Sequence, residues 1–389
     1  MIQALAIFQD AYRELNHRKL FWVTVAISGL VVFVFAAIGN DEEGLTVLHW
    51  SIPFPLASSN FIPTADFYKF VFSSFGVGLW LSWVATVIAL ISTASIFPDF
   101  VDRGSIDLML SKPIGRPRLF LLKFLTGLLF AAIQVTVFTV ASFLVIGIRG
   151  GDWEPWLFVA IPLVVLFYSY LFAVQAVIGL LTRSVIASVI GVMFFWLAIF
   201  LVQTGDGVTL AWRVSQEITV ERFDSKIERY RENAIESEEL RRDLTLQIEL
   251  GDTLLDRELA SATRDADFWA TRLVNVDDEL AREERTLEIA TMVNAWLHRL
   301  NTVLPKTSET IALLGRILED KAGVVLPSTE NRNDARDRLG DLVGRSVFEK
   351  RMKEAIDESH SYTWVLGTSL GFEAIVLGFG LWRFTRRDY

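Results

Sequence analysis

The sequence predicts an all-α, polytopic membrane protein with six transmembrane helices and an extracytoplasmic helical insertion between the fifth and the sixth. Hydrophobic residues make up 52% of the 389 residues and the mean hydropathy is +0.39, as is typical of membrane proteins. Residues 204–362 nevertheless carry 33 acidic and 23 basic side chains, against 13 and 14 in the remainder. The acidity therefore belongs to one segment, which we expect to be soluble, and it does not indicate nucleic-acid binding.

Six apolar runs have about the length of 20 residues that a helix needs to cross the hydrocarbon core. They are Leu20–Ile38, Val77–Phe97, Phe124–Ile146, Trp156–Leu181, Ser184–Gln203 and Thr363–Trp382. Only a short turn around Arg183 separates the fourth from the fifth. The first run could be interpreted either as a transmembrane anchor or as a cleaved signal peptide. We favour an uncleaved anchor, because residues 1–19 before it show apolar residues at helical spacing and predict an amphipathic helix along the cytoplasmic membrane surface.

Basic residues predict the orientation of these spans, because Lys and Arg concentrate in cytoplasmic segments. With the N-terminus inside, the short outer loops hold only Lys69 and Arg149. The inner segments hold Arg13, Arg18, Lys19, Arg103, Lys112, Arg116, Arg118, Lys123, Arg183, Arg383, Arg386 and Arg387. We therefore expect both termini in the cytoplasm, spans one to five within residues 20–203, and the last span with its basic tail within 363–389.

Residues 204–362 predict helices with a heptad-like apolar pattern. One stripe comprises Phe223, Ile227, Tyr230, Ala234, Leu240, Leu244 and Ile248, and another Ala266, Trp269, Leu273, Val276, Leu280, Glu283, Leu287, Ala290 and Asn294. We expect an antiparallel hairpin that turns either near Gly251-Asp252 or within residues 260–267. Its charges are interpreted as a solvated helix face, with a docking surface for an extracytoplasmic partner as the alternative.

Catalytic patterns are missing from the sequence. It contains no cysteine, no G-x-x-x-x-G-K-[ST] phosphate loop and no H-E-x-x-H, and its four histidines are scattered, with His298 and His360 far from any motif. We expect no enzyme activity and no metal site in this chain. Glu373 lies near the middle of the last span, where a carboxylate is costly unless it faces the bundle interior or water. It is either a pathway residue or a protonated group bonded to a neighbouring helix, such as the helix with Gln134 or with Gln175.

The segment DRGSIDLMLSKPIGRPRLFLLKF, residues 102–124, resembles the connection between spans two and three of permeases of type-2 ABC exporters. That family shows an acidic residue, Gly, leucines, a small residue, Lys or Arg, Pro and a basic run. The matching positions are Asp102 for the usual Glu, Gly104, Ile106, Leu108, Leu110, Ser111, Lys112, Pro113, Arg116, Arg118, Leu119 and Lys123. ELNHRKLFW, GLLTRSVIASVIG and LWRFTRRDY are similar to further segments of the family. The helical insertion is a departure from it.

The resemblance implies a permease subunit in a bacterial-type plasma (inner) membrane. It would pair with a second permease copy or paralogue and with two separate ATPase subunits, which bind ATP and Mg, so that this chain needs no cofactor. The family seats this connection, here within residues 98–119, on the ATPase as a coupling helix. The implied coupling residues are Asp102, Arg103, Gly104, Ile106, Asp107, Leu108, Leu110, Lys112 and Pro113. The alternative function is a membrane-anchored scaffold or sensor that works through the coiled-coil insertion.

Overall fold

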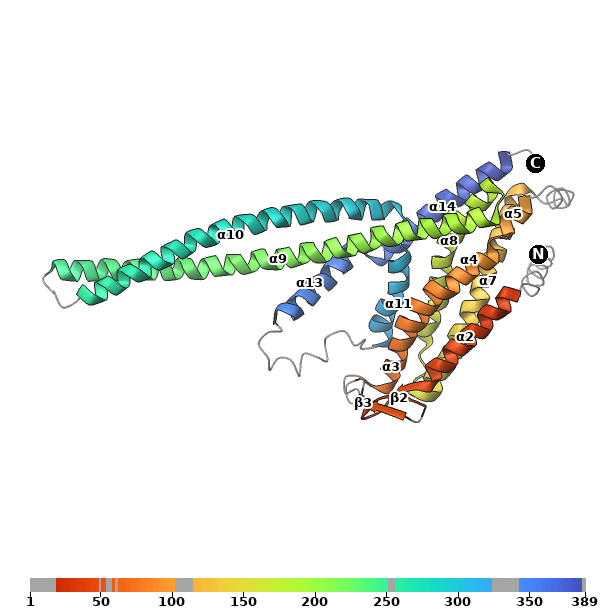
Figure 1. Ribbon diagram of the computed structural model, residues 1–389, viewed down its shortest axis with the longest axis horizontal. Coiled ribbons are helices and arrows are strands. Elements are labelled where there is room, and N and C mark those ends of the chain that lie inside the picture. Colours follow the sequence, from red (N-terminus) through yellow and green to blue (C-terminus); the bar gives the residue numbers. More distant parts are fainter. Residues whose placement is uncertain are drawn as a thin grey trace. The chain divides into compact units, whose positions relative to one another are not determined.

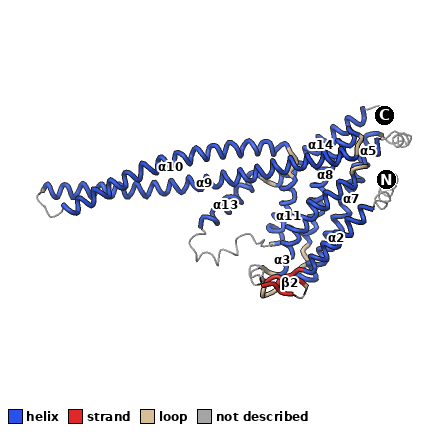
Figure 2. Tube along the Cα trace, in the orientation of Figure 1, coloured by secondary structure: helices blue, strands red, loops and turns tan. Residues whose placement is uncertain are grey.

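The computed structural model describes residues 19–48, 50–53, 58–59, 62–101, 115–250, 256–323 and 343–386. Nearly all of these residues are helical (Figure 2). The chain divides into two compact units. Unit 1 comprises Met1–Gln203, Asn301–Gly340 and His360–Tyr389, and unit 2 comprises Thr204–Leu300 and Asp341–Ser359. The segment expected as a single insertion, 204–362, therefore contributes to both units.

Unit 1 is a bundle of apolar helices (Figure 1). Its elements are α2 (Lys19–Ala37), α3 (Thr64–Val71), the π-helix η2 (Phe72–Ala85), α4 (Thr86–Thr93), α5 (Ile96–Val101), α7 (Arg116–Val145), η3 (Ile146–Gly150), η4 (Pro155–Val159), α8 (Ala160–Thr182), the first part of α9 (Val185–Glu249), α11 (Thr307–Ala322) and α14 (Tyr362–Arg386). Five of the described helices, with their direct continuations, are long and apolar enough to cross a membrane, and Phe21–Ala37 is a shorter apolar helix. Apolar helices thus occur at all six expected places.

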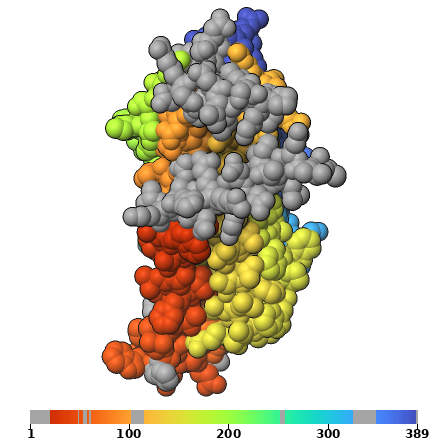
Figure 3. Space-filling model, turned by 90° about the vertical axis from the view of Figure 1, so that its right-hand side faces the viewer, coloured from red at the N-terminus to blue at the C-terminus, as the bar shows by residue number. Residues whose placement is uncertain are grey.

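The bundle helices meet through large side chains. On one face of unit 1, α2 (red) lies alongside α7 (yellow), as Figure 3 shows. Helix α11 packs on α8 and η2 through Leu313, Leu314 and Leu318, which are all buried. This helix follows α10 in the chain, yet it belongs to the core of the bundle rather than to the hairpin.

A small antiparallel sheet interrupts the helical pattern. Strands β1 (Ile38–Asn40), β2 (Gly44–Val47) and β3 (Trp50–Pro53) pair in sequence order. The turn between β1 and β2 is held by Asp41, whose Oδ1 accepts hydrogen bonds from the backbone N–H groups of Glu43 and Gly44, both at 2.9 Å. The all-α expectation did not include this sheet. Its strands have only three or four residues each, too few for an alternating pattern to emerge from the sequence.

The expected tight turn around Arg183 is confirmed. Helix α8 ends at Thr182 and α9 begins at Val185. Arg183 takes the left-handed conformation (φ 54°), and its N–H donates to the carbonyl of Gly179 at 2.9 Å, which ends the helix in the usual way.

Helices α7 and α8 approach closely at Gly127. A Cβ built at this glycine would lie 2.2 Å from Cζ of Phe172. We expect Gly127→Ala to lower the free energy of unfolding by about 1–3 kcal/mol, because the ring is locked in the packed interior. Gly367→Ala is the matched control, since a Cβ there meets nothing within 4 Å. Thermal unfolding in detergent measures both, and equal midpoints would contradict the close approach.

Unit 2 is a helical hairpin with a third helix. It comprises α9 from Thr204, α10 (Asp256–Val303) as far as Leu300, and α13 (Val343–Ser359). Since α9 ends at Glu249 and α10 begins at Asp256, the chain turns where Gly251-Asp252 was expected, although these two residues lie outside the described ones. The alternative turn at 260–267 is wrong, because those residues are helical within α10.

The seam of the hairpin follows the heptad pattern with one correction. All nine predicted positions on α10 are buried or half-buried, and the Tyr230 and Trp269 rings lie 5.4 Å apart. On α9, Leu244 is 7% exposed but Leu240 is 53% exposed, so Leu240 was wrongly placed in the seam. Helix α13 packs Phe348, Met352, Ala355 and Ile356 against Leu210, Val214 and Ile218 of α9.

Candidate functional site

The expected coupling residues lie outside the described residues. They are Asp102, Arg103, Gly104, Ile106, Asp107, Leu108, Leu110, Lys112 and Pro113. The same holds for residues 1–18, including Arg18, for the side chain of Lys19 and for Arg387. Of the expected coupling segment 98–119, the structure describes both ends, which run up to Val101 at the end of α5 and from Gly115 just before α7; we call the residues between them, 102–114, the coupling segment from here on.

Six buried phenylalanines hold these two ends. We call them the phenylalanine cluster: Phe97 and Phe100 on α5, Phe120 and Phe124 on α7, Phe172 on α8 and Phe384 on α14. The Phe97 ring lies 5.2 Å from that of Phe120, and Phe384 lies 5.2 Å from Phe100 and 6.0 Å from Phe120. Rings at these distances are in contact. Both ends of the coupling segment are therefore packed against α8 and α14.

Two further contacts fix the same region. Pro98 on α5 lies against Gly179 of α8, where a built Cβ would be 3.0 Å from its Cδ. Arg116, the first residue of α7, donates from Nη1 to the carbonyl of Thr385 at 3.3 Å. Pro117 follows at the start of α7, where its missing N–H costs no helical hydrogen bond. Helix α7 thus begins directly after the coupling segment, and Arg116 bonds the start of α7 to the end of α14.

The described basic residues of the expected cytoplasmic side gather at one end of unit 1. The end of α5, the start of α7, the turn from α8 to α9 and the end of α14 lie together there, and the sheet lies at the opposite end (Figure 1). These elements carry Arg116, Arg118, Lys123, Arg183, Arg383 and Arg386. Lys69 and Arg149 lie near the sheet: the Nζ of Lys69 pairs with Asp152, and Nε of Arg149 donates to the hydroxyl of Tyr68. The six basic residues are therefore separated from Lys69 and Arg149 along the bundle.

Glu373 is buried between α14 and α8. Its Oε2 accepts a hydrogen bond from Oγ of Ser169 at 3.1 Å. Ser169 lies on α8, which is also the helix of Gln175, so the carboxyl group does bond to a neighbouring helix, through a different residue. Gln175 instead donates to the carbonyl of Leu90 at 2.9 Å. Gln134 is buried, and within the described part of the chain neither of its amide atoms has a hydrogen-bond partner.

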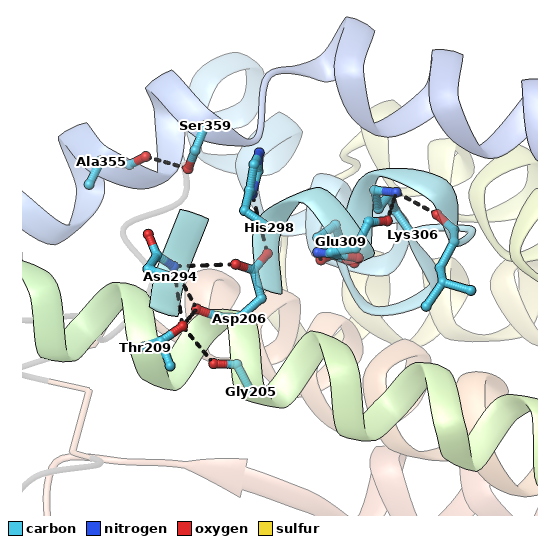
Figure 4. A network of polar contacts seen from close by, with 11 residues as sticks. Gly205, Asp206, Thr209, Asn294, His298, Lys306, Glu309, Ala355 and Ser359 are labelled. Carbon is cyan, nitrogen blue, oxygen red and sulfur yellow. Dashed lines mark hydrogen bonds and ion pairs between the residues drawn. The ribbon is translucent and has the colours of Figure 1, made fainter. Parts of the chain in front are cut away.

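Figure 4 shows polar networks that sequence reasoning missed. In unit 2, the buried Asp206 accepts from Nδ2 of Asn294 at 3.3 Å and lies 3.3 Å from Nδ1 of His298. Asn294 also donates to Oγ1 of Thr209 at 3.2 Å. His298 was expected to be isolated, but a carboxylate 92 residues earlier in the chain lies beside it. Heptad spacing on α10 marked Asn294 as a seam residue and was the only available signal.

In unit 1, Lys306 is fully buried just before α11. Its Nζ donates to the carbonyls of Asn301 and Leu304 (the Lys306 contacts are drawn in Figure 4) and lies 4.6 Å from the centre of the Trp364 ring. Its backbone N–H donates to Oγ of Ser369 on α14 at 2.8 Å. These contacts fasten the start of α11 to α14, so we assign Lys306 a structural role.

Comparisons with protein-family models, with curated proteins and with solved structures found no match to this chain.

Proposed function

We propose that this protein is the membrane permease subunit of an ABC exporter, driven by separate ATPase subunits that bind ATP and Mg. The observation that carries the proposal is the phenylalanine cluster. A segment with the sequence features of a coupling helix, 102–114, is joined at both ends to buried side chains that contact two other helices of the bundle. The segregation of basic residues at the same end supports a cytoplasmic position.

The cluster suggests how ATP-driven motion reaches the bundle. Closure of the ATPase pair pushes the coupling segment, and its two ends move with it. Since interiors are close-packed and transmit strain, a shift of Phe100 or Phe120 moves Phe384 on α14, and a shift of Phe97 moves Phe172 on α8. Helices α8 and α14 then tilt between two packed arrangements, which opens the path toward one side of the membrane or the other.

The expected partners follow from the same proposal. Two ATPase subunits bind at the basic end, a second permease copy or paralogue completes the path, and the lipid bilayer surrounds the apolar helices. Glu373 is a candidate for an ionisable side chain on the path, with a protonated group bonded to a neighbouring helix as the alternative, and its bond to Ser169 is what a structural role requires. The membrane is a bacterial-type inner membrane, with unit 2 on its outer side.

Co-purification tests the proposal. The tagged full-length chain is purified from its native cells, and mass spectrometry is used to look for a protein with a phosphate loop. Alanine substitution of Asp102, Gly104 and Leu108 together is expected to remove that ATPase, because it deletes a charge and a large apolar side chain that the coupling segment would present to it. The matched control is the same change at Asp224, Gly207 and Leu250, which are exposed in unit 2. Retention of the ATPase by the first triple variant would refute the coupling assignment.

Cysteine labelling tests the orientation, since the chain has no native cysteine. Ser261→Cys on α10 is expected to react with an impermeant maleimide added outside spheroplasts. Thr182→Cys, exposed at the end of α8, is expected to react only after the membrane is opened. The reverse pattern would place the basic end outside and contradict the proposal.

A second candidate function is the membrane-anchored scaffold or sensor. One face of α10 exposes Ile289, Met292 and Trp296, and exposed apolar side chains in a row are typical of a contact surface. Under this alternative, removal of residues 211–290 abolishes the scaffold or sensor activity, and that activity does not depend on binding of an ATPase. Under the permease proposal, the shortened chain still retains the ATPase.

A further inference from the structure

Unit 1 contains an apolar cavity of about 500 Å³, a size typical of ligand pockets. It lies between α2, β2, α3 with η2, and α7. Its walls include the rings of Phe35, Phe67 and Phe138, and Ser142 supplies the only hydroxyl among the described residues that line it. The Oγ of Ser142 is buried and has no hydrogen-bond partner within the described part of the chain. Such walls suit a hydrocarbon and offer water very few partners.

The cavity opens sideways through helices that are apolar on their outer surface as well. Val34 on α2, and Phe75 and Leu79 on η2, line the cavity and are about half exposed. All three lie in helices that we expect to cross the membrane. The opening then faces the hydrocarbon core of the bilayer, which consists of acyl chains.

A cationic side chain, Arg149, is linked through Tyr68 to one of the residues that line the cavity. Nε of Arg149 donates to the hydroxyl of Tyr68 at 3.0 Å, and that hydroxyl donates to the carbonyl of Ile38 at 2.8 Å. Ile38 lines the cavity. The guanidinium lies close to the next residue, since a Cβ built on Gly39 would be 3.2 Å from Nη2 of Arg149. The charge is thus held close to Ile38 and Gly39, and Ile38 lines the cavity.

Arg149 has donors left for a ligand. Its side chain is exposed, and among the described residues no carboxylate lies within ion-pair distance of it. The neighbouring carboxylates of Asp66 and Asp152 are engaged by Lys69, at 3.8 and 2.5 Å. A guanidinium presents its N–H groups in a fork that matches a phosphate.

We propose that this cavity binds one anionic phospholipid, with an acyl chain between α2 and η2 and the headgroup phosphate on Arg149. Two separate features of unit 1 serve the two parts of the ligand: the apolar walls take the acyl chain, and the guanidinium of Arg149 takes the phosphate. The site is independent of the ATPase and of the coupling segment, so it stands or falls separately from the proposed function.

Native mass spectrometry of the full-length protein tests the site. The protein is delipidated and titrated with dioleoylphosphatidylglycerol or with dioleoylphosphatidylcholine. The wild type is expected to retain the anionic lipid at least about tenfold more tightly than the neutral one. Both lipids offer a phosphate to the guanidinium, but in phosphatidylcholine the trimethylammonium group beside that phosphate carries the same charge as Arg149 and weakens the charge-assisted contact. Arg149→Gln should abolish this preference, and Arg149→Lys should restore part of it. Arg229→Gln, which removes another exposed charge, from α9 in unit 2, is the control that should change nothing.

A cavity-filling variant tests whether the cavity binds the acyl chain of the lipid. Val34→Trp is expected to displace the bound lipid, whereas Ile186→Trp, on an exposed position of α9 away from the cavity, should retain it. Circular dichroism confirms that each variant is folded. Equal binding of both lipids by the wild type, or unchanged binding in both Arg149→Gln and Val34→Trp, would overturn the proposal.

Discussion

Phe120→Ala is expected to lower the free energy of unfolding of unit 1 by about 3 kcal/mol. Phe120 is fully buried, and its ring contacts Phe97 and Phe384, so the truncation leaves a cavity where α5, α7 and α14 meet. Buried Phe→Ala changes cost about 3–5 kcal/mol, and we expect the lower end, because in the proposed membrane setting the hydrophobic driving force between helices is weaker than in water. Equilibrium unfolding in mixed micelles measures the change.

Phe33→Ala is the matched control for this prediction. Phe33 lies on α2 and is 64% exposed, so its truncation removes few contacts and is expected to cost less than about 1 kcal/mol. Phe120→Leu supplies a folded variant for function, since it keeps most of the volume and loses the ring contacts. In the complex with the ATPase, Phe120→Leu should retain binding and weaken transport. Equal unfolding midpoints for Phe120→Ala and Phe33→Ala would show that the cluster does not hold the coupling ends.

Leu244→Asp is expected to open the hairpin of unit 2, at a cost of about 3 kcal/mol or more. Leu244 is 7% exposed in the seam, so the change removes a buried apolar side chain and places a carboxylate in a desolvated position. Because hydrogen exchange reports local opening, we expect faster amide exchange along α9 and α10 while unit 1 is unaffected.

Leu240→Asp distinguishes the seam observed in the structure from the seam that the heptad spacing predicted. Both leucines were assigned to the seam, but Leu240 is 53% exposed and the same change there should alter amide exchange little. If Leu240→Asp opened the hairpin as far as Leu244→Asp does, the register described here would be incorrect.

The error at Leu240 has a physical cause. The seam of α9 proceeds from Ala234 to Ser237, Arg241 and Leu244, in three- and four-residue steps, and the half-buried positions are polar. Arg241 is tolerated there because it pairs with Glu238, at 2.5 Å from Nη2 to Oε1. That hydrogen bond and the nearby charge raise the pKa of the Arg241 guanidinium above its ordinary value. A pattern based on hydrophobicity alone therefore predicts Leu240 in the seam, one position before the actual seam residue Arg241.

The features that sequence predicted are those encoded locally. The apolar runs, the turn at Arg183 and the heptad steps of α10 each depend on residues near one another in the chain. The remaining features join distant residues. Nothing in the sequence around Asp206 indicates His298, and nothing around Ser169 indicates Glu373, because these contacts depend on how helices pack. The phenylalanine cluster was missed for the same reason, since Phe residues are common in every apolar run.

Site-specific photo-crosslinking from position 108 shows whether an ATPase contacts the coupling segment in the cell. A benzoylphenylalanine replaces Leu108 in the coupling segment of the full-length chain, and irradiation of intact cells is followed by mass spectrometry of the captured protein. The same group at Leu250, which is exposed in unit 2, is the control. We expect capture of a phosphate-loop ATPase from position 108 and none from position 250. Capture of no such ATPase from position 108, or of the same proteins from both positions, would contradict the claim that this chain is driven by ATP hydrolysis through residues 102–114.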